Sequence, residues 1–156
     1  MELFKQMSGT KIVHVPYKGG GAGIADLISG QVQLMMESLN SITPHARAGR
    51  VQALGVSGAK RSAALPEVPT IAEAGVPGYE ATTWNGLVAP AGVPKAIVAK
   101  LNAELNRALA AATLRQRFAV LGAEPVGGSP GQFAALIRKE HAKWGEVIRR
   151  SGAKID

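Results

Sequence analysis

The sequence predicts an α/β fold with a largely parallel sheet. Over residues 11–57, short β-branched segments alternate with stretches of helical periodicity, and the order strand, helix, strand, helix, strand is typical of parallel α/β units. The 156 residues are 46% hydrophobic and 19% charged, which is typical of folded proteins rather than disordered ones. Since this length fits one domain of ordinary size, we expect one compact unit or a piece of a larger one.

Hydrophobic periodicity divides the first half of the chain into elements. Runs of β-branched or continuous apolar residues indicate strands, and apolar residues at helical spacing indicate helices. The expected strands are 11–15, 32–37 and 51–57, and the expected helices are 22–29, 41–48 and a short one at 70–74 that Thr70 caps. A helix end over the first eight residues, stopped by Gly9, precedes them.

The second half is predicted to be mostly helical. A strand at 81–89 precedes helices at 94–112, 113–122 and 130–150, with one brief strand at 124–126. Amphipathic helices bury their apolar stripes against another surface, and this part of the chain offers only one short strand for that purpose. We therefore expect these helices to pack either on the first sheet or on a sheet that the chain does not contain.

The most informative segment for function is the glycine-rich turn between the strand at 11–15 and the helix at 22–29. In open α/β sheets, ligands bind beyond the carboxyl ends of strands, where a helix start presents free N–H groups and a positive dipole end to an anion. Gly19, Gly20 and Gly21 allow close backbone approach, and Lys18 adds a positive charge. The pattern is also compatible with a plain tight turn. It matches neither GxGxxG nor GxxxxGK[ST].

Other polar and aromatic residues are candidates for the same site. Glu37 and Ser38 end the next strand and are expected at the same edge of the sheet, although Ser41 nearby is equally explained as a helix cap. Trp84 and Tyr17 would either wall the crevice or belong to the core. The candidate ligand-binding residues are Tyr17, Lys18, Gly19, Gly20, Gly21, Ala22, Glu37, Ser38 and Trp84.

Several functions are not expected. The chain has no Cys, and its three His residues are far apart with no HxxxH spacing, so we expect no metal, no cofactor and no catalytic residues. A net charge of +7 favours an anionic partner, but the basic residues are scattered and aromatic residues are few, so nucleic acid is not expected. No stretch is long enough to span a membrane, and MELFKQMSGT has no export signal.

Four segments closely resemble the receptor subunits of tripartite tricarboxylate transporters, the Bug family, and together they cover nearly the whole chain. The matching segments are residues 14–36, 44–80, 84–105 and 121–155. The resemblance implies a type II periplasmic-binding-protein fold, in which two α/β lobes close on a small carboxylate. It implies a periplasmic receptor, not an enzyme, that passes a di- or tricarboxylate to membrane transporter subunits.

The resemblance also assigns roles to parts of this sequence. The YKGGGA stretch, Tyr17 to Ala22, is similar to the family's ligand-facing loop in the second lobe, and Glu37 and Ser38 match a position where the family commonly has Asp and Asn. Trp84 matches the strand that returns to the first lobe. This implies a second ligand-binding lobe at 1–90 and a mostly helical return segment at 91–156. Family members have roughly twice this length, so we expect a truncated receptor.

Three hypotheses follow from these observations. The first is an anion-binding receptor module with half of its cleft, for which we expect affinity of about millimolar order, because two-lobe closure completes such sites. The second is a non-binding remnant that self-associates, for example as a homodimer through its unpartnered helices. The third is an α/β enzyme that uses the glycine turn for phosphate.

Overall fold

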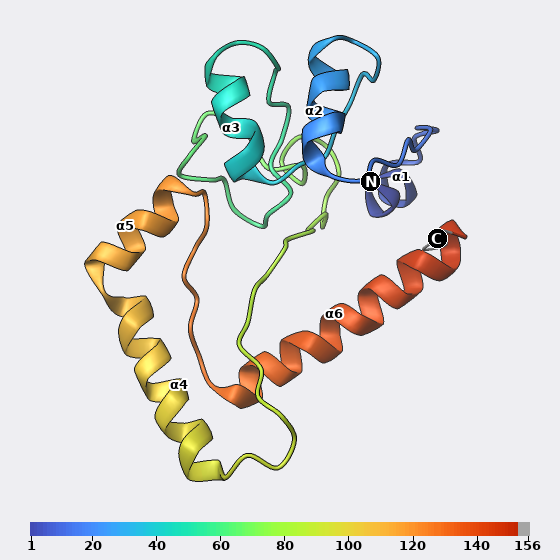
Figure 1. Cartoon of the computed structure of the whole chain (residues 1–156). Helices are drawn as coiled ribbons and strands as arrows, with labels where there is room; N and C mark the ends of the chain where they lie inside the picture. The colour runs from blue at the N-terminus through green and yellow to red at the C-terminus, as the bar shows by residue number, and fades with distance from the viewer. Residues whose placement is uncertain (153–156) are drawn as a thin grey trace. The chain divides into compact units, whose positions relative to one another are not determined.

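The computed structural model describes residues 1–152, and the chain divides into two compact units. Unit 1 comprises residue 1, residues 3–82 and residues 119–123, and unit 2 comprises residue 2, residues 83–118 and the chain from residue 124 onward. Figure 1 shows the helices of both units. They are α1 (Glu2–Ser8), α2 (Gly20–Ile28), α3 (Leu39–Arg47), α4 (Lys95–Ala110), α5 (Ala112–Val120) and α6 (Pro130–Ser151).

Most of the predicted helices form close to their expected places. Both α2 and α3 begin two residues earlier than predicted, while α4, α5 and α6 follow the expected ranges closely. Pro44 is tolerated inside α3, five residues after the helix begins. The predicted helix at 70–74 is a turn in the structure, closed by a hydrogen bond from the Ala74 N–H to the Thr70 carbonyl at 3.0 Å.

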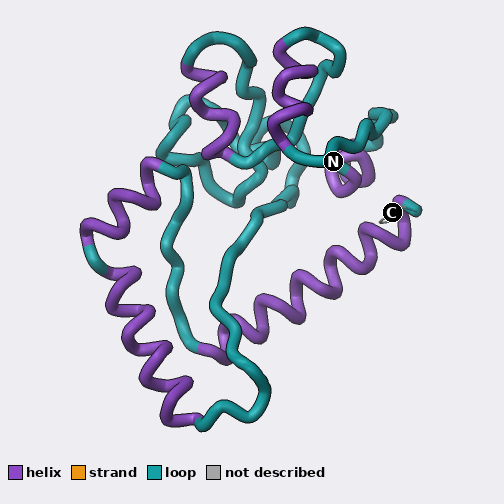
Figure 2. The backbone as a smooth tube through the Cα atoms, in the orientation of Figure 1, coloured by secondary structure: helices purple, strands orange, loops and turns teal. Residues whose placement is uncertain are grey.

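The predicted strands are not formed in the described residues, so the predicted parallel sheet is not confirmed. Residues 11–15, 32–37, 51–57, 81–89 and 124–126 run as loop, as Figure 2 shows, apart from one isolated parallel bridge between Val56 and Thr70. A strand needs a neighbouring strand for its ladder of hydrogen bonds. Here only short contacts occur, such as the bond from the Val56 N–H to the Pro69 carbonyl at 2.9 Å. Side chains that a sheet would bury are exposed, with Val13 84% accessible.

The core of unit 1 is small and lies under the loop that follows α3. Val56, Leu65 and Val68 are buried together, and Leu39 at the start of α3 packs against them. Tyr79 is 2% exposed, with its ring edge-on to another aromatic ring of unit 1. Because this core gathers residues from several loops around α3, it fixes the segment that leads from Glu37 into α3.

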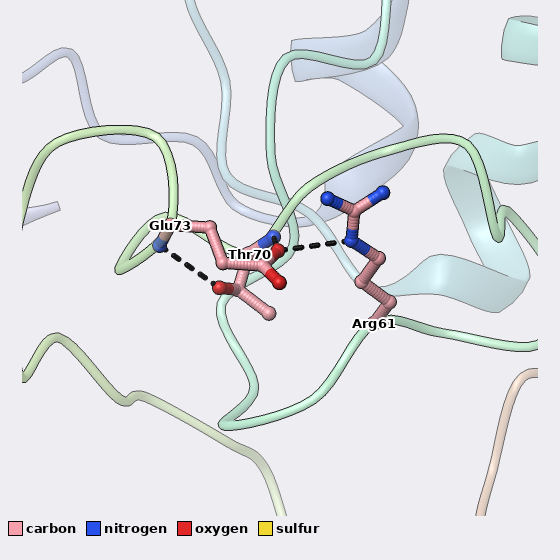
Figure 3. Close-up of polar contacts among 3 residues, drawn as sticks. All are labelled: Arg61, Thr70 and Glu73. Carbon is pink, nitrogen blue, oxygen red and sulfur yellow. Dashed lines mark hydrogen bonds and ion pairs between the residues drawn. The ribbon is translucent and has the colours of Figure 1, made fainter.

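A polar cluster fastens the loop over residues 61–73 of unit 1 (Figure 3). The Glu73 carboxylate accepts hydrogen bonds from the Thr70 N–H at 2.8 Å and from the Arg61 Nε at 3.0 Å, and the Glu73 N–H donates to the Thr70 hydroxyl at 3.1 Å. The bond from the Thr70 backbone and the charge of Arg61 hold the pKa of Glu73 below its usual value. The capping role predicted for Thr70 is therefore present, although it closes a turn instead of a helix.

Unit 2 is organised by α4 and α6. A capping box begins α6, in which Ser129 and Gln132 exchange hydrogen bonds between side chain and backbone. The preceding loop is tied to α4 because the Asn106 side chain donates to the Gly128 carbonyl at 3.0 Å and accepts from the Gly128 N–H at 2.8 Å. The Trp84 ring stands edge-on to Phe133 of α6, with centroids 5.4 Å apart.

Candidate anion-binding site

The site begins at the uncapped start of α2 in unit 1. Gly19 is the N-cap residue with φ of 146°, a backbone conformation that side chains rarely adopt. No side chain caps α2, so the N–H groups of its first turn lack the usual side-chain acceptor. A helix start of this kind favours an anion through its free donors and the positive end of its dipole.

The residues of the glycine turn differ in what surrounds them. A Cβ added to Gly21 would meet no atom within 4 Å, so the backbone there faces open space. Lys18 and Ala22 are exposed as well. By contrast, a Cβ on Gly20 would collide with the Glu37 carboxylate. An external ligand therefore has access to the turn on the side of Gly21.

Tyr17 packs along α2 rather than presenting its hydroxyl to the open side. The hydroxyl donates to the Asp26 carboxylate at 2.7 Å, and the ring approaches Gly23, where a Cβ would lie 3.3 Å from the Tyr17 Cδ2. This hydrogen bond to the carboxylate, together with desolvation, raises the pKa of Tyr17. Sequence reasoning did not identify Asp26, although Gly23 and Asp26 share one face of a helix at a spacing of three. The pair fixes the orientation of the turn relative to α2.

The Glu37 carboxylate lies against Gly20 of the turn, and Ser38 is bonded to that carboxylate. The Glu37 Oε1 accepts hydrogen bonds from the Ser38 N–H at 2.8 Å and the Ser38 hydroxyl at 2.7 Å. Ser38 is the N-cap residue of α3 but makes no side-chain cap bond, and its hydroxyl lies 3.2 Å from the hydroxyl of Ser41. Hence the capping role considered for Ser41 is not observed, since α3 begins before it.

Trp84 belongs to unit 2, whereas the other eight candidates belong to unit 1. Within unit 2, Trp84 is 41% exposed and lines an apolar groove of about 350 Å³ along α6, together with Ile137, Trp144 and Ile148. Its role as a wall of the ligand crevice stays a prediction.

Neither a metal centre nor a membrane helix is found in the part of the chain that the structure describes. Over residues 1–152, no group of three or more His, Asp or Glu side chains is arranged to hold a metal ion. None of the helices within that range is long and apolar enough to cross a bilayer. The candidate site therefore consists of backbone donors, one lysine and a nearby carboxylate.

Comparison with known proteins defines the family. Residues 1–153 match the family described as the tripartite tricarboxylate transporter family receptor. A UPF0065 protein from the tcbD-tcbE intergenic region of Pseudomonas sp. strain P51 is 42% identical over 147 residues, which cover 94% of this chain and 44% of that protein.

Solved structures agree with this match. The structure of R. palustris Rpa4515 with adipate is 41% identical with a TM-score of 0.83, covering 97% of this chain and 50% of that one. MatC (Rpa3494) from Rhodopseudomonas palustris, with bound malate, is 36% identical with a TM-score of 0.72, over 94% of this chain and 51% of that one.

The chain thus matches about half of the fold of the periplasmic binding proteins that it resembles. It belongs to the tripartite tricarboxylate transporter receptor family, also called the Bug family, which confirms the resemblance read from the sequence. This family consists of periplasmic solute-binding receptors rather than enzymes. The chain spans about half the length of most of the relatives that it matches.

Proposed function

We propose that this chain is an extracytoplasmic receptor, or part of one, that binds a small di- or tricarboxylate at the start of α2 and delivers it to a tripartite transporter in the membrane. The observation that carries this proposal is the uncapped first turn of α2, reached through glycines and open at Gly21. Its support from relatives is that two solved structures of similar proteins hold adipate and malate.

The geometry accounts for an anion in physical terms. A charged acceptor gains about 1.5–3 kcal/mol from a hydrogen bond of this kind, and the helix dipole adds about 0.3–1 kcal/mol. Lys18 is exposed beside the turn and supplies a positive charge on a flexible side chain. We expect an affinity of about millimolar order for a site formed by one lobe, which corresponds to about 4 kcal/mol. One lobe therefore binds weakly, and closure with a second lobe strengthens binding.

We further propose that residues 1–90 form the second ligand-binding lobe and that residues 91–156 return to the first lobe. The segments at 11–15, 32–37, 51–57 and 81–89 have the composition of strands and would pair when neighbouring strands are present. Support comes from the high structural similarity to receptors twice as long. Trp84 would then stand on the strand between the lobes and close one side of the crevice.

Calorimetric titration with succinate, citrate and phosphate tests the receptor function. We expect heat with the di- and tricarboxylate at millimolar concentrations and none beyond dilution with phosphate. Lys18→Ala should weaken carboxylate binding several-fold without changing the helical circular dichroism. Lys60→Ala, which removes an equally exposed lysine of unit 1, is the matched control and should bind as the unchanged protein does. Identical titrations for Lys18→Ala and Lys60→Ala would remove Lys18 from the site.

A second candidate function is self-association without ligand. The observation in its favour is the exposure of apolar side chains on the long helices of unit 2, including Ile97 at 51%, Leu101 at 59% and Ile148 at 48%. Such stripes are buried in stable assemblies. A dimeric mass in sedimentation equilibrium together with a silent titration would favour this function over the receptor.

A further inference from the structure

The carboxylate of Glu37 is held against the first turn of α2. Its Oε1 accepts both hydrogen bonds from Ser38, which fixes the orientation of the group. Its Oε2 lies over the backbone of Gly20, and a Cβ on that residue would collide with it. Among the residues that the structure describes, no donor binds this second oxygen. The protein therefore presents a carboxylate oxygen with free lone pairs at the mouth of the proposed site.

The glycine at position 20 explains how the Glu37 carboxylate comes so close to α2. Gly20 has no positive φ, so its backbone conformation does not require glycine. What requires glycine there is space, because the Glu37 Cδ would lie 3.0 Å from a Cβ at residue 20. At the next position, Gly21 has open space around it. Adjacent glycines thus serve two purposes, since one admits the internal carboxylate and the other leaves room for an external group.

An ionised carboxylate accepts hydrogen bonds and donates none. A ligand carboxylate bound to the N–H groups near Gly21 would lie close to the negative charge of Glu37 and would be repelled by it. A hydroxyl or ammonium group on the carbon next to that ligand carboxylate would instead donate to the free Oε2. The internal carboxylate therefore separates ligands by whether they carry a donor beside the bound carboxylate.

We propose that Glu37 makes the site selective for carboxylic acids with a 2-hydroxy or 2-amino group over acids whose carboxylates are joined only by methylenes. The ligand carboxylate takes the N–H groups at Gly21 and Ala22, and the neighbouring donor takes the Glu37 Oε2. This inference rests on the proposed function, because it concerns the same turn of α2.

Titrations of malate, aspartate and succinate into the unchanged protein and into Glu37→Gln test the inference. These ligands share the four-carbon dicarboxylate skeleton and differ only at the second carbon. For the unchanged protein we expect malate and aspartate to bind about tenfold tighter than succinate. In Glu37→Gln the preference should fall toward one, because the hydroxyl and ammonium donors lose a charged acceptor, whereas the repulsion of the bound carboxylate is relieved for all three ligands alike. Aspartate should lose the most affinity, because its ammonium group loses an oppositely charged partner. Malate carries no positive charge and loses no such partner.

Two further variants make the outcome decisive. Glu67→Gln removes a carboxylate of unit 1 that lies outside the proposed site and is more exposed than Glu37, so it should keep the tenfold preference. Gly20→Ala displaces the Glu37 carboxylate without altering it, so it should also lower the preference, and it serves if Glu37→Gln does not fold. Equal affinity for malate and succinate in the unchanged protein would overturn this inference alone, as would an unchanged preference in Glu37→Gln. Silence with all three acids would overturn the proposed function together with it.

Discussion

Gly86→Ala tests whether the packing of unit 2 is as tight as the structure indicates. A Cβ at residue 86 would collide with the Phe133 Cζ and lie 2.7 Å from two other ring carbons. Carbon atoms prefer about 3.5–4.0 Å, so the ring would have to move by about 1 Å. The Trp84 ring stands edge-on to Phe133 and opposes that movement. We expect a loss of about 1–3 kcal/mol in the free energy of unfolding, typical of overpacking.

Urea unfolding followed by tryptophan fluorescence measures this loss. Both tryptophans of the chain, Trp84 and Trp144, lie in unit 2, so their emission reports that unit. The midpoint should fall by about 0.5–1.5 M at a typical urea slope. Gly131→Ala, near the start of α6, is the control, because its added Cβ would lie in ordinary van der Waals contact with the Ser129 Oγ, at 3.9 Å. Alanine favours a helix over glycine by about 1 kcal/mol, so this midpoint should not fall. Equal midpoints for both variants would refute the packing argument.

Two further predictions concern polar contacts. The hydrogen bond from the Thr70 backbone and the contact with Arg61 lower the pKa of Glu73, so the native state binds fewer protons than the unfolded state. The contribution of Glu73 to stability is therefore complete above its unfolded pKa and is lost as the pH falls through its native pKa. Glu73→Gln should therefore flatten the fall in stability across the acidic range, as measured by urea midpoints, and an unchanged slope would contradict it. Asn106→Ala removes the bonds to Gly128 and should cost about 1 kcal/mol, seen as a lower thermal midpoint, whereas an unchanged midpoint would show that the loop is held otherwise.

The sequence predicted helices better than strands, for a physical reason. The backbone hydrogen bonds of a helix form within its own segment. The predicted ends of α4 and α6 therefore lie within a residue or two of the observed ones. The backbone hydrogen bonds of a strand form only with another segment. The KIVHV run at 11–15 has no partner strand in the described residues. Val13 and Val15 have high β-propensity, so the segment has the composition of a strand although it lacks the hydrogen bonds of one.

The candidate site was predictable in its backbone and unpredictable in its side-chain pairs. Three consecutive glycines before a helical pattern indicate an open helix start, and the structure has one at α2. The bond between Tyr17 and Asp26 depends on how the loop folds back over the helix, and no periodicity encodes that path. The same holds for Glu37, whose side chain reaches Gly20 from a separate segment.

The nearness of Glu37 to α2 changes how an anion site of this type works. A helix start with free donors attracts any anion of suitable size, so by itself it gives affinity with little selectivity. An internal carboxylate fixed by Ser38 repels every ligand carboxylate and supplies a hydrogen-bond acceptor that only ligands with a neighbouring donor can use. In the proposed site, selectivity would then come from a charge that the protein keeps beside the ligand, and the glycine at position 20 is what allows that charge to come so close.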